Sequence, residues 1–167
     1  MIVWLNGPFG VGKTTVARAL LEAKPTWSLL DPEVRGEELS RTSPGVDDFQ
    51  DLPAWRKAVV EDAVERVGNG DLVIPMTIWR LDHYREITDG LKGADEVRPF
   101  RLTAAEETLR DRILNDGEER RAAGWRLDRL AAGLETFEDT AFGDHVATDG
   151  RSPEKVAELI LVTLTRA

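Results

Sequence analysis

The chain has 167 residues, of which 41% are hydrophobic and 32% charged, so it fits one globular domain with a buried core. Its net charge of −9 at pH 7 argues against a general nucleic-acid binder, because affinity for a phosphate backbone needs many Lys and Arg contacts. The lack of cysteine excludes disulfides, thiol chemistry and cysteine-ligated zinc. No apolar run approaches the roughly 18 residues of a membrane span, and no signal peptide precedes the first predicted strand. We therefore expect a cytoplasmic protein, either a monomer or a homodimer.

An apolar run opens the chain and leads directly into a glycine-rich loop. Residues 1–5 read MIVWL, which is short, hydrophobic and branched, as a buried strand should be. Residues 7–14 read GPFGVGKT and fit the phosphate-binding motif G-x-x-x-x-G-K-T. The apolar residues of 16–21 then recur with the spacing of one helix face. Strand, glycine loop and helix in this order are the context that the motif requires, so the sequence predicts binding of a nucleoside triphosphate.

The residue types of this loop suit a triphosphate. Its glycines let backbone N–H groups turn toward a phosphate, and the helix N-terminus adds partial positive charge. Lys13 can reach the β- and γ-phosphates, and the Thr14 hydroxyl can bind Mg²⁺. We expect ATP or GTP to contact nine consecutive residues: Gly7, Pro8, Phe9, Gly10, Val11, Gly12, Lys13, Thr14 and Thr15.

Strands and helices alternate along the rest of the chain. Four further apolar runs predict strands: 27–30, 72–74 (ended by Pro75), 97–102 and 145–148. Periodicity and capping residues predict helices: 55–67, a helix that ends near Asn115, 127–134, and a closing helix from Pro153 with Ser152 as N-cap. The segment 35–53 is polar and is expected to be a connection that includes one short helix. This alternation predicts an α/β domain, residues 1–167, with helices on both faces of a parallel sheet.

Acidic and hydroxyl side chains follow the predicted strands at the edge that carries the phosphate loop, because right-handed crossovers gather the strand ends there. Asp31 follows the second strand, where its carboxylate can accept a proton from a substrate hydroxyl or, with Thr14, hold Mg²⁺. Alternatively, Asp31 opens a turn or caps the next helix. Thr77, after the third strand, either contacts the substrate or caps a helix. Because that strand ends without an acid, a small kinase is favoured over motor and switch NTPases.

Arginines are frequent after the fourth strand. Phosphoryl transfer needs positive charge that closes over the γ-phosphate and excludes water. We predict a lid at about residues 115–127, called the lid segment below, which carries Arg120, Arg121 and Arg126. Arg112 precedes it on a helix that can aim the side chain at the nucleotide in a catalytic role. The alternative is a solvated face on which acidic neighbours balance these arginines.

Two further sets of residues are candidates for ligand contacts. Asp149 follows the fifth strand, where such a sheet meets the nucleotide base, although a plain turn explains it as well. Trp55 begins an apolar helical stripe and is equally suited to the core, and Phe49 shares this ambiguity. The candidates for the acceptor pocket, besides Asp31, are Arg35, Asp48, Phe49, Trp55, Arg56 and Thr77.

Five stretches beyond the phosphate loop carry a family resemblance. They read DPE (31–33), DDFQDLPAWR (47–56), VIPMTIW (73–79), ETLRDRI (107–113) and FGDHVATD (142–149). With them the chain resembles the tunicamycin-resistance protein family, within the small P-loop kinases of the nucleoside-monophosphate-kinase superfamily. The likeness spans nearly the whole chain; the phosphate loop is generic, whereas the second and third stretches are much more particular.

The resemblance implies a three-layer fold with a five-stranded parallel sheet ordered 2-3-1-4-5 and a small helical lid. It also implies phosphoryl transfer from ATP or GTP, with Mg²⁺, to a hydroxyl of a small molecule, with Asp31 as base and with Lys13 and the lid arginines on the transferring phosphate. The implied acceptor is a nucleoside-type antibiotic. Two alternatives stay open, sequestration of the drug without turnover and a metabolic nucleoside or sugar kinase, because architecture does not fix the acceptor.

Overall fold

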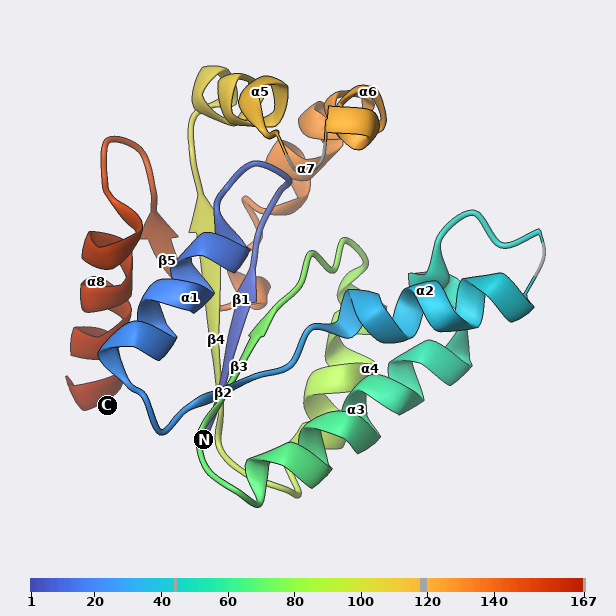
Figure 1. Ribbon diagram of the computed structural model, residues 1–167, viewed down its shortest axis with the longest axis vertical. Coiled ribbons are helices and arrows are strands. Elements are labelled where there is room, and N and C mark those ends of the chain that lie inside the picture. The colour runs from blue at the N-terminus through green and yellow to red at the C-terminus, as the bar shows by residue number, and fades with distance from the viewer. Residues whose placement is uncertain (44, 118–119, 167) are drawn as a thin grey trace.

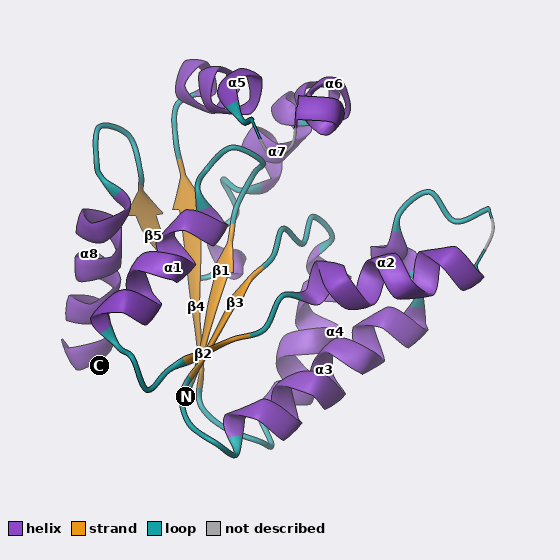
Figure 2. Ribbon diagram, viewed as in Figure 1, coloured by secondary structure: helices purple, strands orange, loops and turns teal. Residues whose placement is uncertain are grey.

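A computed structural model of the protein describes residues 1–43, 45–117 and 120–166. Its centre is a parallel sheet with the strand order β2-β3-β1-β4-β5 (Figures 1 and 2). The strands are β1 Ile2–Asn6, β2 Ser28–Leu29, β3 Leu72–Pro75, β4 Val97–Thr103 and β5 Asp144–Ala147. The α/β class expected from the alternation and the strand order implied by the resemblance are both confirmed.

Helices form a layer on each face of the sheet and a third group above the carboxyl ends of the strands (Figure 1). One face carries α1 Lys13–Ala23 and α8 Pro153–Arg166; the other carries α2 Pro32–Thr42, α3 Pro53–Val67 and α4 Leu81–Leu91. The group above the strand ends comprises α5 Glu106–Asn115, α6 Ala123–Asp128 and α7 Leu130–Thr136. Single turns complete the chain: η1 Phe49–Asp51, η2 Arg120–Ala122 and η3 Thr140–Phe142. Within the described ranges, no helix combines the length and hydrophobicity that a membrane span needs.

Strand β1 organises two hydrophobic cores because both of its faces are buried. Val3 and Leu5 point into the core beneath α1 and α8, whereas Ile2 and Trp4 point into the core beneath α3 and α4. The chain therefore leaves β1 at the centre of the molecule. The loop that follows β1 is held by packing on both faces of the sheet.

Two boundaries differ from the sequence expectation. Pro75 is the last residue of β3, in register with Leu5, because the ladder continues through the Met76 amide, which donates to the Leu5 carbonyl at 3.0 Å. The segment expected to be a polar connection is instead largely helical: α2 begins at Pro32, directly after its N-cap Asp31. Pro at the first helical position favours this start, and the apolar signal is weak because α2 is mostly exposed. The predicted helix over 127–134 is divided in two, since α6 ends at Asp128 and α7 begins at Leu130.

One glycine lets α2 approach η1 closely. Gly36 is buried in α2, and a Cβ atom there would lie 2.7 Å from the Phe49 ring. Phe49 in turn stacks against Trp55 at a centroid distance of 5.1 Å. The close approach of α2 to η1 therefore requires glycine, which has no side chain, at position 36.

We expect Gly36→Ala to lower the free energy of unfolding by about 1 to 2 kcal/mol, because the aromatic ring must move to admit the methyl group. Gly124→Ala in α6 is the matched control, since a Cβ atom there meets no atom within 4 Å. It should stabilise the protein by up to about 1 kcal/mol through helix propensity alone. Urea unfolding of both variants measures this, and equal stabilisation of the two would contradict the close approach.

Candidate active site

The phosphate loop depends on three glycines in left-handed or otherwise glycine-only backbone conformations. Gly7, Gly10 and Gly12 have φ angles of +147°, +77° and +94°. A Cβ atom at Gly7 would lie 2.5 Å from the Leu102 carbonyl oxygen, and one at Gly10 would lie 2.8 Å from that of Leu109. The loop thus presses directly on β4 and α5. Its shape, with Gly12 as the N-cap of α1, leaves the helix N-terminus directed at the space above the loop.

Asn6 is a functional candidate that the sequence reasoning missed. Its side chain is fully buried; Oδ1 accepts the amides of Gly7 and Ile78, both at 2.9 Å, and Nδ2 donates to the Ile78 carbonyl at 3.3 Å. These bonds fasten the start of the phosphate loop to the chain that leaves β3. The available signal was an amide side chain at the end of an otherwise apolar strand, directly before the first glycine.

Lys13 lies across the loop to which it belongs. Its ammonium group donates to the carbonyl oxygens of Gly7 and Pro8, both at 3.0 Å. Burial lowers the pKa of Lys13 from 10.5 to about 7, opposed by the nearby carboxylate of Glu33 and reinforced by the guanidinium of Arg126. An amine in this setting gains most from an anion, so the geometry suits a phosphate group.

Thr14 and Thr15 lie in the first turn of α1, and both are exposed. Among the described residues, no three His, Cys, Asp or Glu side chains are grouped to hold a metal ion. Mg²⁺ commonly uses one or two protein oxygens, substrate phosphates and water, and the exposed Thr14 hydroxyl at the helix start fits such a site.

Asp31 caps α2, as one of the two sequence interpretations proposed. It is exposed, and its Oδ1 accepts the Glu33 amide at 3.0 Å. Glu33, in the same turn, is the acid whose charge acts on Lys13. Two carboxylates therefore lie at the start of α2; Glu33 acts on the phosphate-loop lysine, whereas the sequence had singled out only Asp31.

A chain of buried hydrogen bonds runs from the phosphate loop into the α3–α4 layer. The Thr77 hydroxyl donates to the Gly7 carbonyl at 3.0 Å, and the Gln50 side-chain amide donates to the Thr77 carbonyl at 2.9 Å. Arg56 continues the chain, donating to the Gln50 carbonyl and to Glu86, both at 2.6 Å. The N-cap of α4 is Arg80, so the alternative that Thr77 caps that helix is wrong; Thr77 is only 2% exposed, and its contact with substrate stays a prediction. Its hydroxyl positions the loop.

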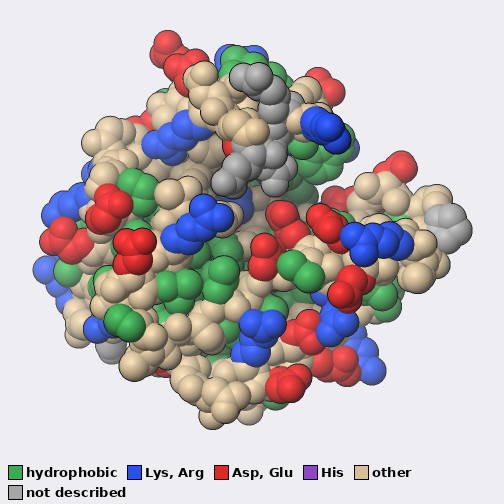
Figure 3. All heavy atoms as spheres, viewed as in Figure 1, with side chains coloured by type: hydrophobic (Ala, Val, Ile, Leu, Met, Phe, Trp, Pro, Cys, Tyr) green, Lys and Arg blue, Asp and Glu red, His purple; other side chains and the backbone are tan. Residues whose placement is uncertain are grey.

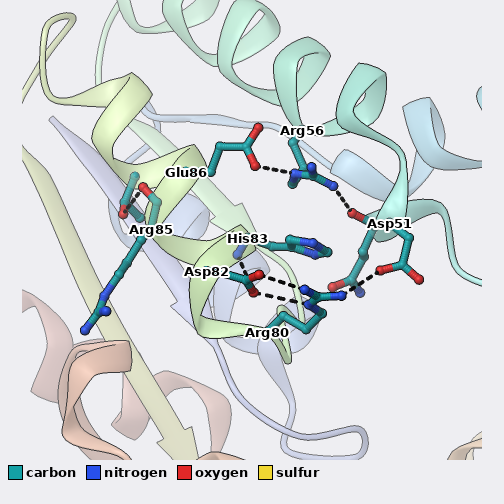
Figure 4. A network of polar contacts seen from close by, with 9 residues as sticks. Asp51, Arg56, Arg80, Asp82, His83, Arg85 and Glu86 are labelled. Atoms are coloured by element: carbon teal, nitrogen blue, oxygen red, sulfur yellow. Dashed lines mark hydrogen bonds and ion pairs between the residues drawn. The ribbon is translucent and has the colours of Figure 1, made fainter.

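Figure 4 shows the polar cluster around Arg56, with the His83 ring between the guanidinium groups of Arg56 and Arg80. Arg80 pairs with Asp82 at 2.7 Å and with Asp51 at 3.6 Å. Burial, and then the two arginines, lower the pKa of His83. The Arg56 side chain is 9% exposed and already pairs with Glu86, which makes it a structural cation in this arrangement.

The other acceptor-pocket candidates have structural contacts. Trp55 has no exposed surface and its indole N–H donates to the Pro32 carbonyl at 3.0 Å, so the prediction that it lines the pocket is corrected: it belongs to the core. Asp48 caps η1 through the Gln50 amide, and Arg35 pairs with Asp62 at 3.0 Å. Phe49 is half-buried against Gly36.

Arg112 and Asp149 each make structural hydrogen bonds near the phosphate loop. Arg112 donates to the hydroxyl and carbonyl of Thr148, at 2.9 and 3.1 Å, and to the Val11 carbonyl at 3.3 Å. Asp149 accepts the Ala105 amide at 2.9 Å, and this bond is the main cause of its lowered pKa. Arg112 fastens the loop to Thr148 at the end of β5, and Asp149 fastens the segment between β5 and α8 to the start of α5. Direct contact of either with a nucleotide stays a prediction.

Within the lid segment, Arg126 is the arginine that the structure brings to the phosphate loop. Its guanidinium lies 5.5 Å from the centre of the Phe9 ring and pairs with Asp116 at 3.0 Å. Arg121 is exposed, and the side chain of Arg120 lies outside the described part of the chain. On the face of the molecule shown in Figure 3, acidic and basic side chains are intermingled rather than separated.

A phosphate loop between β1 and α1, the sheet order β2-β3-β1-β4-β5 and helices above the strand ends define a small P-loop kinase fold. A family model described as an AAA domain matches residues 3–126. The solved tunicamycin resistance protein of Deinococcus radiodurans is 31% identical with a TM-score of 0.78, over 98% of this chain and 94% of that one. The chain therefore belongs to the AAA-domain family and, within it, to the small P-loop kinases of the tunicamycin-resistance protein family.

More distant structures share the fold alone. A gluconokinase from Sinorhizobium meliloti 1021 is 20% identical, with a TM-score of 0.70 over 99% of this chain and 91% of that one. A shikimate kinase from Acinetobacter baumannii, solved in complex with shikimate, is 18% identical, with a TM-score of 0.68 over 99% and 93%. A comparison with curated proteins found no match. The neighbours are small-molecule kinases, and their acceptors differ from one another.

We expect Asn6→Ala to lower the free energy of unfolding by about 2 to 4 kcal/mol, since it leaves two buried amides without acceptors. It should also weaken triphosphate binding, because the loop loses its anchor. Asn115→Ala removes an exposed side chain that donates only within α5, to the Asp111 carbonyl at 2.8 Å, and should change neither quantity. Urea unfolding and calorimetric titration measure both, and an Asn6→Ala protein with unchanged affinity would contradict the anchoring role.

The lowered pKa of Lys13 predicts a pH-dependent stability. Between its folded pKa of about 7 and its unfolded pKa of 10.5, this amine binds fewer protons in the folded state, so its contribution becomes more favourable as the pH rises. We expect the Tm of the nucleotide-free protein to rise relative to that of Lys13→Met between pH 7 and pH 10. A constant or opposite difference would show that burial does not suppress the charge of Lys13.

Proposed function

We propose that this protein is a phosphotransferase that uses ATP or GTP with Mg²⁺ to phosphorylate a hydroxyl of a small molecule, most specifically a nucleoside-type antibiotic related to tunicamycin. The observation that carries the proposal is Lys13, held against the Gly7 and Pro8 carbonyls between an acid and an arginine. The 31% identity with a tunicamycin resistance protein supports this choice of acceptor. The proposed unit is one domain, residues 1–167, with the lid segment at about 115–127.

In the proposed reaction the acceptor oxygen attacks the γ-phosphorus, and the bond between that phosphorus and the bridging oxygen of the β-phosphate breaks. The acceptor proton passes to a carboxylate at the start of α2, for which Asp31 is our candidate and Glu33 the neighbouring one. The nucleoside diphosphate leaves. Lys13 and Arg126 stabilise the charge on the transferring phosphoryl group.

Mg²⁺ would be held by the Thr14 hydroxyl, with Asp31 in reach through water, and it would neutralise phosphate charge when bound. The acceptor would lie between the phosphate loop and α2, where Arg35, Asp48 and Phe49 remain proposed contacts. Arg112 and Asp149 remain proposed contacts of the nucleotide. A nucleoside or sugar kinase of ordinary metabolism would use the same arrangement with another acceptor.

The direct experiment is a mass-spectrometric acceptor screen with Mg-ATP and Mg-GTP. Transfer adds about 80 Da to an acceptor hydroxyl, the mass of one phosphoryl group. Calorimetry with tunicamycin and with nucleosides runs in parallel. Tight binding of a drug whose mass stays constant would show that the protein sequesters the drug and does not phosphorylate it. Nucleotide hydrolysis without any phosphorylated acceptor would count against the proposed enzyme.

Asp31→Asn tests the base without disturbing the fold, because Asn caps a helix as well as Asp does. We expect turnover to fall by about 10² to 10⁴ while the affinity for nucleotide is kept. Asp47→Asn, at an exposed position before η1, is the matched control. Unchanged turnover in Asp31→Asn together with a large loss in Glu33→Gln would transfer the role of base to Glu33.

A further inference from the structure

One aromatic ring, that of Phe9, joins the phosphate loop to its surroundings on two sides. The Phe9 ring lies 5.1 Å from Trp79, which follows β3, and 5.1 Å from Trp125 in α6. Phe9 packs at the margin of one hydrophobic core and Trp79 at the margin of the other. Contact with Trp79 therefore holds Phe9 on one side, and the Phe9 ring also contacts Trp125 next to the lid arginine.

Helix α6 has unusual packing for an element that covers a site. None of its residues, all of which the structure describes, is buried. Trp125 is 44% exposed, so it contributes little to either core. Its ring is instead placed between Phe9 and the guanidinium of Arg129, which lies 3.9 Å from the ring centre. Two weak but directional contacts, a tilted contact between aromatic rings and a cation–π attraction, hold this side chain.

The residue after Trp125 is the lid arginine. Arg126 lies over the same Phe9 ring, at 5.5 Å, and the Lys13 ammonium lies 5.8 Å from that ring's centre. Two cations that repel one another are thus held beside the same aromatic ring. Asp116, the C-cap of α5, pairs with Arg126 at 3.0 Å and also holds the guanidinium.

We propose that Phe9 and Trp125 form an aromatic clasp that docks α6 on the phosphate loop and thereby positions Arg126 for the terminal phosphate of a bound triphosphate. This inference rests on the proposed function. Phe9 and Trp125 are positioning residues: they act through Arg126. The phosphate loop motif leaves the position of Phe9 open to any residue, and an aromatic side chain at that place provides a surface for both the lid tryptophan and the lid arginine.

The clasp predicts how strongly the protein distinguishes a triphosphate from a diphosphate. An arginine held over the terminal phosphate raises affinity for the triphosphate only. The Kd of the diphosphate divided by the Kd of the triphosphate therefore reports on Arg126. The probes are a non-hydrolysable ATP analogue and ADP, each with Mg²⁺, and the matching guanine pair. Neither titration requires an acceptor or turnover.

Trp125→Ala should reduce this ratio by about fivefold or more, as should Arg126→Ala, because both remove the same charge-assisted contact. The double variant should lose no more than either single one, since the two residues act in series. Trp125→Phe keeps an aromatic ring on Phe9 and should retain most of the preference. Leu114→Ala is the matched control, because Leu114 is a large apolar side chain that is 51% exposed on α5.

A second measurement follows the clasp itself. The fluorescence emission of Trp125 is obtained as the difference between the spectra of the wild type and Trp125→Phe. Acrylamide should quench this emission more strongly when Phe9→Leu removes the aromatic ring that contacts Trp125. Thermal unfolding of Trp125→Ala, Trp125→Phe and Arg126→Ala should stay close to that of the wild type, since α6 buries none of its residues.

The outcomes separate the clasp from the proposed activity. A wild type that does not prefer triphosphate overturns the clasp, whereas the acceptor screen alone decides the proposed phosphotransferase. A wild type that prefers triphosphate, and keeps its preference in Trp125→Ala, overturns the clasp alone. If Trp125→Ala loses the preference for triphosphate and Trp125→Phe retains it, the clasp is supported, because an aromatic ring at this position would not restore a general structural defect.

Discussion

The backbone of Gly7 is the point on which the site depends. Its amide donates to Asn6, and its carbonyl accepts both the Lys13 ammonium and the Thr77 hydroxyl. Buried peptide groups must find partners inside the protein, and here the partners come from β1, from α1 and from the chain after β3. One peptide unit therefore sets the relative positions of the loop, the first helix and the neighbouring strand end. A side chain at this residue is excluded by β4, whose Leu102 carbonyl lies where the Cβ would be.

Electrostatics then gives this rigid frame its chemistry. Lys13 is placed where burial disfavours its charge, with Arg126 adding repulsion and Glu33 adding attraction. An incoming phosphate relieves both unfavourable terms at once, which is why such an arrangement suits a triphosphate better than a neutral ligand. The overall charge of −9 does not oppose this, because screening limits exposed charges to about 10 Å, whereas partly buried charges act directly on their neighbours.

The sequence was most informative where a local pattern has only one physical explanation. Residues 7–14 combine glycines with Lys13 and Thr14 in a spacing that ordinary turns do not need, and the predicted loop is present. Strands β1 and β3 were found because a parallel strand that is buried on both faces leaves a short apolar run. Helix α2 was expected to be mostly a connection because its exposed faces are polar, so the sequence carried a cap and a proline but little apolar periodicity. The boundary at Pro75 was missed because a proline can end a strand as its last paired residue.

The sequence by itself determined the phosphate loop and the α/β class, because both depend on local patterns that neighbouring residues dictate. Only the tertiary structure decided which polar side chains face the site. Thr77 and Arg56 were candidates by position along the chain, yet they are used up in buried bonds to Gly7, Gln50 and Glu86. Asn6, Glu33 and Trp125 gained their places only from partners far away in the sequence. The direction of a side chain at a strand end depends on the elements that pack around it, and no local pattern specifies them.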